Sequence, residues 1–483
     1  MKGPFIVALD LGTSGCRAAA ITQQGKIACE QREELFPVRG VDGSSHYNAQ
    51  TLLEVQLRVL NKLLDQVTPS QVAGISVASQ RSTVVLWNAR TGAAVAPVLT
   101  WEDGRATQEI GQVVISQEEV HQVTGLYKNP YFSAPKIAWC LKNLPATQEA
   151  LENGDLCIGP VATYFIWNLT RGTVFSTDAS LAQRTLLFDI NTWHWNAQLC
   201  DAFGIAKSSL PSIAPSAHDY GVYTYQGVDI PILGCVGDQQ AAAYWFGLKP
   251  AQSCINYGTG AFWLYHAGKE PVSLPGMLTS VSAQTKEGKN FFLEGPVNAA
   301  GSIFLWLEAQ GISCKDTTLD SICQRAKYPV RLLPALGGLG APYFNFLVNP
   351  TVELLSSQTR KADWVAGAAR GLALLLADIA VYLKNNGCQL QGPIMAAGGL
   401  SRFEYLLNFQ ADVLQLPLLL GKDADATVLG AAKLAATQTT WDTQPWQVET
   451  ERTVNPRISP QQAQNLYEQW QVFVRRVIEQ TTK

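Results

Sequence analysis

The chain has 483 residues, of which 47% are hydrophobic and only 16% are charged. This length predicts two or three domains with sizeable cores, and the low charged fraction argues against a disordered chain. The 36 basic and 39 acidic residues give a net charge of −3, so we expect no electrostatic binding to nucleic acid or to an anionic membrane.

The N-terminus and the cysteines bear on localisation. The apolar run 5–9 is interrupted by Asp10, too early for a signal peptide. The most apolar later stretch, 371–383, contains Asp378 and is too short to span a bilayer. The ten cysteines show no C-x-x-C spacing, which is typical of buried thiols in a reducing compartment rather than of a zinc or redox site. We therefore predict a cytoplasmic protein.

The first predicted elements form a strand, a turn and a strand. An apolar strand begins at Phe5 and ends in the turn Gly12-Thr13-Ser14-Gly15, a second strand covers 16–22, and a third run begins at Lys26. Buried strands are then predicted over 74–79 and 230–237, and a small-residue helix over 241–247. We place the domain boundary directly after this helix, which gives domains 1–247 and 248–483.

The second half repeats the pattern of the first. A strand from Cys254 leads into the turn Gly258-Thr259-Gly260 and a further strand over 261–265. Helical spacing predicts a long buried helix over 365–383, a strand covers 393–399, and another helix starts close to Ser401. Strands that alternate with helices indicate an α/β fold with partly parallel sheets. Two strand-turn-strand units half a chain length apart suggest duplicated domains.

The two glycine-threonine turns are candidate phosphate sites. Glycines in a tight hairpin let the backbone approach an anion closely and expose successive N–H donors, and the threonine hydroxyl adds another donor. A single such turn commonly needs glycine only for its positive φ. Two copies favour a ligand held between the two domains.

Two aspartates at strand ends are the candidates for chemistry. Asp10 precedes the first turn, where it could hold Mg²⁺ through water or simply cap the turn. Asp238 closes an apolar strand and opens a helix, so it is either an N-cap or a base facing a cleft. Next to it, Gln239 offers neutral hydrogen-bonding groups suited to hydroxyls. Arg17 could reach a phosphate, or be a solvated strand residue.

Arg81 and Trp101 also follow apolar runs. Polar groups at strand ends beside a tryptophan are typical of sugar sites, in which the ring lies under C–H faces. Each residue could equally be structural, as a surface ion pair or a core tryptophan. The five histidines show no metal-binding or catalytic spacing.

Taken together, the motifs resemble those of the FGGY carbohydrate kinases, and within that family those of glycerol kinases. The stretches that carry the resemblance span about nine-tenths of the chain and are 8–14, 79–81, 129–133, 237–240, 257–260, 398–399 and 431–432. The resemblance implies two duplicated domains of the actin/hexokinase (ribonuclease H-like) ATPase type around a central cleft. It also implies an ATP-dependent transfer of phosphate to a hydroxyl of a small polyol or sugar.

The resemblance further implies roles for individual residues. Asp238 would be the catalytic base and Asp10 would organise Mg²⁺. The residues expected around the substrate are Arg81, Trp101, Tyr131, Asp238 and Gln239. Those expected around the nucleotide are Thr13, Ser14, Arg17, Thr259, Gly301 and Gly399.

Several positions depart from the glycerol kinase pattern. Ser82 stands where those enzymes have Glu, Leu305 replaces a usual Gln, and Phe403 replaces a usual Asn near the adenine. The identity of the acceptor and the nucleotide preference therefore stay open, as does association into a homo-oligomer. Two alternatives also stay open: an ATP-driven conformational switch of the same superfamily, and a degenerate member that binds a sugar without turnover.

Overall fold

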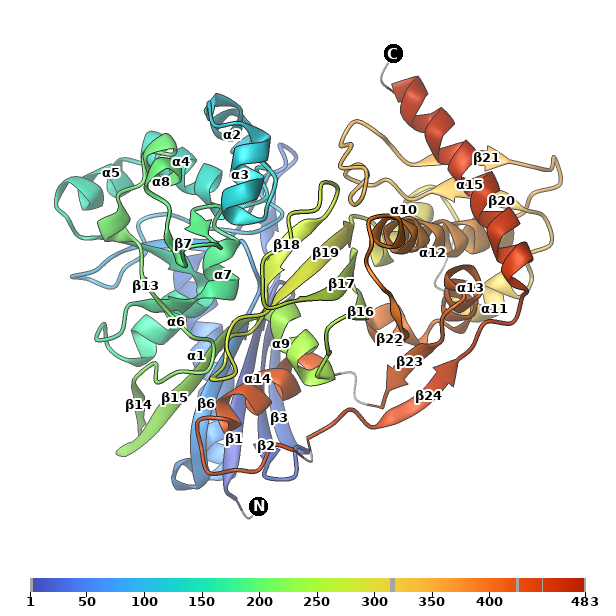
Figure 1. Cartoon of the computed structure of the whole chain (residues 1–483). Coiled ribbons are helices and arrows are strands. Elements are labelled where there is room, and N and C mark those ends of the chain that lie inside the picture. The colour runs from blue at the N-terminus through green and yellow to red at the C-terminus, as the bar shows by residue number, and fades with distance from the viewer. Residues whose placement is uncertain (1–2, 313–317, 423–424, 445, 482–483) are drawn as a thin grey trace.

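The computed structural model describes residues 3–312, 318–422, 425–444 and 446–481, which form two lobes, each built around a mixed sheet (Figure 1). The first sheet has the spatial order β14 (Val222–Tyr225), β15 (Val228–Gly237), β6 (Val72–Ser79), β1 (Phe5–Gly12), β2 (Gly15–Thr22), β3 (Ile27–Glu34). The second has the order β18 (Leu278–Val281), β19 (Phe291–Val297), β17 (Ala261–Gly268), β16 (Gln252–Tyr257), β22 (Gln391–Gly398), β23 (Leu418–Gly421), β24 (Thr450–Val454).

The two sheets share one topology. In the first, β1 pairs antiparallel with β2, β2 pairs antiparallel with β3, and β6 and β15 join the other side of β1 in parallel. In the second, β16, β17 and β19 repeat the antiparallel series, and β22 and β23 repeat the parallel one. The predicted α/β fold with two duplicated domains is confirmed.

Amphipathic helices cover the outer faces of the sheets. Helix α1 (Ala49–Val67) packs on β2 and β3 and buries residues at helical spacing. Its first turn is capped by Asn48, whose side-chain oxygen accepts a hydrogen bond from the amide of Thr51 at 3.0 Å.

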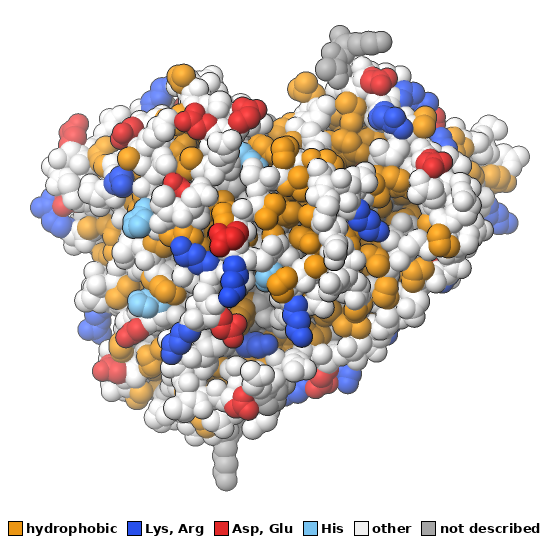
Figure 2. Space-filling view, viewed as in Figure 1, with side chains coloured by type: hydrophobic (Ala, Val, Ile, Leu, Met, Phe, Trp, Pro, Cys, Tyr) orange, Lys and Arg blue, Asp and Glu red, His pale blue; other side chains and the backbone are white. Residues whose placement is uncertain are grey.

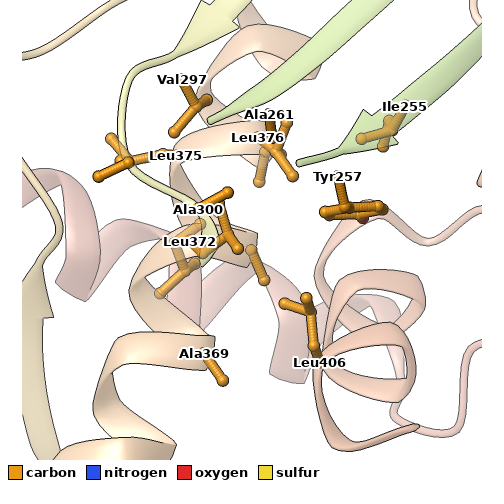
Figure 3. Packing of buried hydrophobic residues seen from close by; sticks show 14 of the residues in the cluster. Ile255, Tyr257, Ala261, Val297, Ala300, Ala369, Leu372, Leu375, Leu376 and Leu406 are labelled. Atoms are coloured by element: carbon orange, nitrogen blue, oxygen red, sulfur yellow. The ribbon is translucent and has the colours of Figure 1, made fainter. Parts of the chain in front are cut away.

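The long helix α12 (Lys361–Asn385) is the core helix of the second lobe. Figure 3 shows its residues Ala369, Leu372, Leu375 and Leu376 packed among side chains from β16, β17 and the segment after β19. Among the described residues it is the one helix long and apolar enough to cross a membrane, but most of it is buried inside the protein. Its apolar composition therefore reflects packing between the sheet and other helices.

Two helices lie between the lobes. Helix α9 (Asp238–Phe246) follows β15, whereas α14 (Ala426–Ala436) follows β23 but packs on α9 and on β1, β6 and β15 of the first sheet. The two helices approach closely, because a Cβ atom added at Gly430 would lie 1.8 Å from the carbonyl oxygen of Ala241. A glycine in α14 thus permits this contact between the lobes.

We expect Gly430→Ala to destabilise the protein by about 1–3 kcal/mol, since the added methyl group overpacks a backbone contact. Thermal unfolding measures the effect. Gly111→Ala is the matched control: Gly111 also lies in a helix, but a Cβ atom there meets nothing within 4 Å. Equal melting temperatures for the two variants would contradict the close contact.

The remaining helices and strands lie around the two central sheets. A small sheet of the first lobe has the order β4 (Val38–Arg39), β5 (Ser45–Tyr47), β8 (Val98–Leu99), β7 (Val84–Asn88), β9 (Leu156–Pro160). Three two-stranded ribbons pair β10 (Ser176–Asp178) with β13 (Ser212–Ala214), β11 (Phe188–Asp189) with β12 (His194–Trp195), and β20 (Val330–Leu333) with β21 (Thr351–Leu354). The further helices are α2 (Thr107–Gln112), α3 (Gln117–Thr124), α4 (Ser133–Asn143), α5 (Pro145–Glu152), α6 (Val161–Leu169), α7 (Ala179–Gln183), α8 (Ala197–Ala202), α10 (Gly301–Ala309), α11 (Leu319–Cys323), α13 (Glu404–Leu414) and α15 (Pro460–Thr481).

The predicted strands and helices of both halves are present, but several boundaries shift. The helix predicted over 241–247 is α9 (Asp238–Phe246), and the one predicted over 365–383 is the longer α12 (Lys361–Asn385). The helix expected to start close to Ser401 is preceded by a short 3₁₀ turn, Gly399–Arg402, and α13 begins at Glu404. On the face shown in Figure 2, acidic and basic side chains are interspersed and hydrophobic side chains gather over part of the second lobe. That face therefore carries no large area of one charge.

Candidate active site

A cavity of about 480 Å³ lies between the two lobes and is lined by residues from both. The predicted site residues that line it are Thr13, Arg81, Trp101, Tyr131, Asp238, Gln239 and Thr259. From the first lobe, Arg81 follows β6 and Asp238 follows β15, and these strands run parallel to β1. Because the carboxyl ends of parallel strands meet at one edge of a sheet, residues far apart in the chain converge there.

The first glycine-threonine turn joins β1 to β2. Gly15 has φ +153°, and a Cβ atom there would lie 2.4 Å from the carbonyl oxygen of Glu33, so only glycine fits. The hydroxyl of Thr13 accepts a hydrogen bond from the indole N–H of Trp101 at 2.8 Å, and its carbonyl accepts one from the hydroxyl of Tyr47 at 2.5 Å. These bonds fix the turn against the ring that forms one wall of the cavity.

The second turn joins β16 to β17 and lies against the start of α10. The amide of Gly301 donates to the carbonyl of Gly258 at 2.9 Å, and the amide of Ala300 donates to the carbonyl of Thr259 at 2.8 Å. A Cβ atom at Gly301 would lie 2.9 Å from that Gly258 oxygen. A helix N-terminus, with its positive partial charge, is therefore held beside the turn.

Asp238 is the first residue of α9, yet it does not cap the helix. Gly237 occupies the N-cap position, and the Asp238 carboxylate accepts a hydrogen bond from the neighbouring amide of Gln239 at 2.7 Å. Burial raises the pKa of Asp238 even though the Arg81 guanidinium, 3.6 Å away, opposes the rise. A carboxylate with a raised pKa at the wall of a cavity has the properties of a general base.

Asp10 lies near the end of β1, close to Asp238. Burial, and secondarily the negative charge of Asp238, raise the pKa of Asp10 to about 7, whereas Arg17 lowers it. Within the described part of the chain, no side-chain hydrogen bond ties Asp10 to the turn, so the interpretation as a turn cap is not supported. Two neighbouring carboxylates that disfavour each other's charge are a natural place for a cation.

The composition of this region fits magnesium better than a transition metal. Among the described residues, no group of three or more His, Cys, Asp or Glu side chains has a metal-binding arrangement. Mg²⁺ keeps several waters and requires only one or two carboxylates. Asp10, with Asp238 nearby, satisfies that requirement.

Aromatic and amide side chains line the cavity beside the turns. The rings of Trp101 and Tyr131 lie with their centroids 5.2 Å apart, and the Arg81 guanidinium lies 5.5 Å from the centroid of Phe262. The amide N–H of Asn256 donates to the side-chain oxygen of Gln239 at 2.9 Å. The Gln239 amide therefore presents its N–H donors to a ligand.

Other predicted residues lie outside the lining of this cavity. Arg17 on β2 forms ion pairs with Glu30 and with Asp425, at the start of α14, so its guanidinium is already engaged. Ser14 and Gly399 are exposed at turns. Asp10 and Gly301 also lie outside the lining of the cavity. The contact of Ser14, Arg17, Gly301 and Gly399 with a nucleotide, and of Asp10 with a metal ion, stays a prediction.

Comparison with known proteins identifies the family. Residues 5–245 match the N-terminal domain of the FGGY family of carbohydrate kinases, and residues 254–439 match the C-terminal domain of the same family. The chain belongs to the FGGY family of carbohydrate kinases. The match to this family confirms the prediction of a phosphotransferase with an alcohol group as acceptor.

Its similar proteins include several glycerol kinases. The chain is 33% identical to a glycerol kinase of Nitratidesulfovibrio vulgaris, covering 98% of each chain, and 33% identical to one of Halorhodospira halophila, covering 99% of this chain and 97% of the other. The fold matches that of a Plasmodium falciparum glycerol kinase with ADP (TM-score 0.89, 24% identity, 98% of each chain). It also matches a Rhodospirillum rubrum xylulose kinase (TM-score 0.86, 20% identity, 99% and 100%).

Sequence reasoning missed two charged residues of the kinase cavity. Glu294 on β19 and Arg184 at the end of α7 both line it and are almost completely buried. Glu294 is the single charged residue in the apolar strand 291–297, and Arg184 follows a helix of small residues. A lone charge inside a buried element is the signal that could have found them, because such groups require partners.

A third missed residue is Lys136 on α4, which is fully buried. Its ammonium group donates to the carbonyl oxygen of Ser82 at 3.0 Å and to that of Thr100 at 2.7 Å. These carbonyls belong to the residues next to Arg81 and Trp101. Lys136 thus connects the two backbone segments that carry Arg81 and Trp101, the residues expected at the substrate.

Proposed function

We propose that this FGGY kinase transfers the γ-phosphoryl group of ATP to a hydroxyl group of a small neutral polyol or sugar, with Asp238 as the base. The observation that carries the proposal is the cavity itself, because one space is lined by both glycine-threonine turns, by Asp238, and by the aromatic and amide wall. Phosphoryl transfer depends mostly on positioning and charge stabilisation, which this arrangement can supply.

The reaction can be written on the residues present. Asp238 accepts the proton of the attacking hydroxyl while the acceptor oxygen forms a bond to the γ-phosphorus. The bond between that phosphorus and the β,γ-bridging oxygen breaks, and ADP leaves with the bond's electron pair. Arg81, Trp101 and Gln239 would hold the acceptor so that its hydroxyl lies within hydrogen-bond reach of Asp238.

The turns would hold the nucleotide. Thr13 of the first turn and Gly258, Thr259 and Gly260 of the second line the cavity, where they would face the phosphates. The Gly301 amide at the start of α10 already donates to the Gly258 carbonyl, so Gly301 would support the second turn beside the nucleotide. The similar Plasmodium falciparum glycerol kinase was solved with ADP, which supports this assignment. Thr13, Ser14, Arg17 and Gly399 remain proposed members of the nucleotide site.

Asp10 would hold Mg²⁺, through water, beside the phosphates. When bound, the ion would neutralise charge that develops on the transferred phosphoryl group. The raised pKa of Asp10 supports the assignment, because a nearby cation would offset the burial and the Asp238 charge that disfavour its ionised form.

The position of Ser82 bears on the acceptor. Ser82 is 3% exposed, lies at the cavity with φ +63°, and its hydroxyl has no hydrogen-bond partner among the described residues. A buried hydroxyl without a partner is costly unless a ligand supplies one. In place of the charged carboxylate of a Glu side chain, the site therefore offers a small hydroxyl and more space. This favours a substrate larger than glycerol.

We expect Ser82→Glu to raise kcat/KM for glycerol relative to larger polyols by about tenfold or more, since a carboxylate would accept a charge-assisted hydrogen bond from a glycerol hydroxyl. Steady-state kinetics with each acceptor measures the change. Ser82→Gln is the matched control, because it has the same length without the charge. An unchanged or lower preference for glycerol in Ser82→Glu would show that Ser82 does not face the acceptor.

The test of the function as a whole is a coupled assay of ADP release with glycerol, erythritol, ribitol, xylulose and ribulose as acceptors. ADP release that depends on one of these compounds supports the kinase. ATP hydrolysis that no acceptor stimulates would favour the conformational switch, and sugar binding without ADP release would favour a degenerate member.

We also propose that the lobes correspond to residues 1–247 and 248–483, because each range contains one complete copy of the shared sheet topology. A cytoplasmic location is supported by the described cysteines, which are all free and mostly buried.

A further inference from the structure

A buried network of charges joins the two lobes beside the proposed base. The carboxylate of Glu294 on β19 accepts two hydrogen bonds from Arg81, from Nη1 at 3.0 Å and from Nη2 at 3.2 Å. The same carboxylate forms an ion pair with Arg184 and accepts a hydrogen bond from the hydroxyl of Ser280 at 2.7 Å. Glu294 is 1% exposed, so its charge is balanced by the two arginines, and the Ser280 hydroxyl adds a hydrogen bond.

This network determines which nitrogens of Arg81 remain available. Both terminal nitrogens of the guanidinium are occupied by Glu294 in the two-pronged geometry that arginine forms most strongly with a carboxylate. Only Nε faces Asp238, at 3.6 Å, which is longer than a hydrogen bond. Arg81 thus lies beside the base without binding it tightly.

We propose that Glu294 is a positioning residue for the kinase reaction, which holds the terminal nitrogens of Arg81 so that Asp238 stays free to accept the proton of the substrate hydroxyl. The inference rests on the proposed function. If Glu294 lost its charge, the released end of Arg81 could turn toward the next carboxylate, Asp238, and form the strong pair there. Asp238 would then be a weaker base, and Arg81 would leave its place at the acceptor.

The charges around Asp238 are consistent with this role. Burial alone would raise the pKa of Glu294, but Arg184 and Arg81 lower it to about 2, so Glu294 stays ionised at any working pH. For Asp238, in contrast, burial raises the pKa more than Arg81 in its present position lowers it. The charged or titratable groups that act on Asp238 or are acted on by it are Arg81, Arg184, Glu294, Asp10 and Tyr131.

The decisive experiment is the pH dependence of kcat/KM for Glu294→Gln. An arginine that pairs with an aspartate lowers the pKa of that aspartate by about 1–3 units. We therefore expect the acidic limb of the profile to move to lower pH by about that amount, with a rise in the KM of the acceptor and little change in the KM of ATP. In an Arg81→Gln background, the additional change Glu294→Gln should not move the acidic limb of the pH profile any further.

Glu353→Gln is the matched control. Glu353 on β21 also accepts hydrogen bonds from two arginines, Arg331 and Arg476, both at 2.7 Å, but it lies outside the cavity. This variant should keep the wild-type pH profile. If Glu294→Gln does not fold, Ser280→Ala removes one of the bonds to Glu294 and should shift the limb in the same direction by a smaller amount.

The outcomes separate this proposal from the proposed function. A wild-type protein without acceptor-dependent ADP release would overturn the function. An active wild type, with a Glu294→Gln variant that loses thermal stability and rate but keeps its acidic limb in place, would show that Glu294 only neutralises buried arginines, and would overturn the positioning role alone.

Discussion

Asp238→Asn is expected to lower turnover by about 10²–10⁴-fold, the usual loss when a general base is removed. Asparagine keeps the shape of the side chain and its contact with the Gln239 amide, but it cannot take up the substrate proton. ATP binding should change little, because Asp238 does not belong to the proposed nucleotide site. Steady-state kinetics with a titration of ATP binding tests both statements.

The control for this experiment lies on the strand that leads to Asp238. Asp229→Asn changes an exposed carboxylate of β15 whose partner is Thr224, at 2.7 Å, and we expect wild-type turnover from it. In the wild-type protein the rate should fall as the pH drops through the raised pKa of Asp238, above the usual range for aspartate. Near-normal turnover in Asp238→Asn would remove this residue from the role of base.

Asp10→Asn is expected to raise the Mg²⁺ concentration needed for half-maximal rate by about 10–100-fold, the typical cost of losing a group that holds a metal ion through an outer-shell contact. Removal of the ion with a chelator should abolish turnover in the wild-type protein. The measurement is the rate as a function of Mg²⁺ concentration. An equal Mg²⁺ requirement in the variant and the wild type would contradict the assignment of Asp10.

A second readout for Asp10 needs no metal. The pKa of Asp10 is about 7 in the folded protein and 3.8 in a model compound, so between these values the folded state binds the extra proton. Stability therefore falls as the pH rises from about 4 to 7, and the ionised carboxylate remains a cost above that range. In the presence of a chelator, Asp10→Asn should melt at a higher temperature than the wild type at pH 8, and the difference should shrink toward pH 4.

Much of the fold could be predicted from local sequence. The central strands of both sheets were predictable because buried strands contain apolar runs that end near glycines, as in 5–9 and 230–236. The strands β14, β18, β19, β23 and β24 were not predicted. The repeat of this pattern at half the chain length predicted the duplication. Asp10 and Asp238 could be singled out because each is a lone carboxylate at the end of such a run.

The spatial groupings could not be predicted in the same way. Local patterns did not show that Arg17 would pair with Asp425, 408 residues away, or that α14 would leave its own lobe to pack on the first sheet, because both contacts join segments far apart in the chain. Glu294 and Lys136 were also missed. Glu294 is the one charged residue of its strand, and Lys136 has only apolar residues directly beside it in α4. The partners that make their burial favourable come from distant segments of the chain.

The fold class, the duplication, the family and the two acidic residues proposed to act could all be inferred from the amino-acid sequence, since they follow from short patterns of burial, glycine turns and charge. The groups that surround those acids are known only from the folded protein. The raised pKa of Asp238, the pairing of Arg81 with Glu294 and the Ser82 hydroxyl, which has no partner in the part of the chain that the structure describes, depend on desolvation and on distances between segments. Such quantities exist only once the lobes have folded against each other.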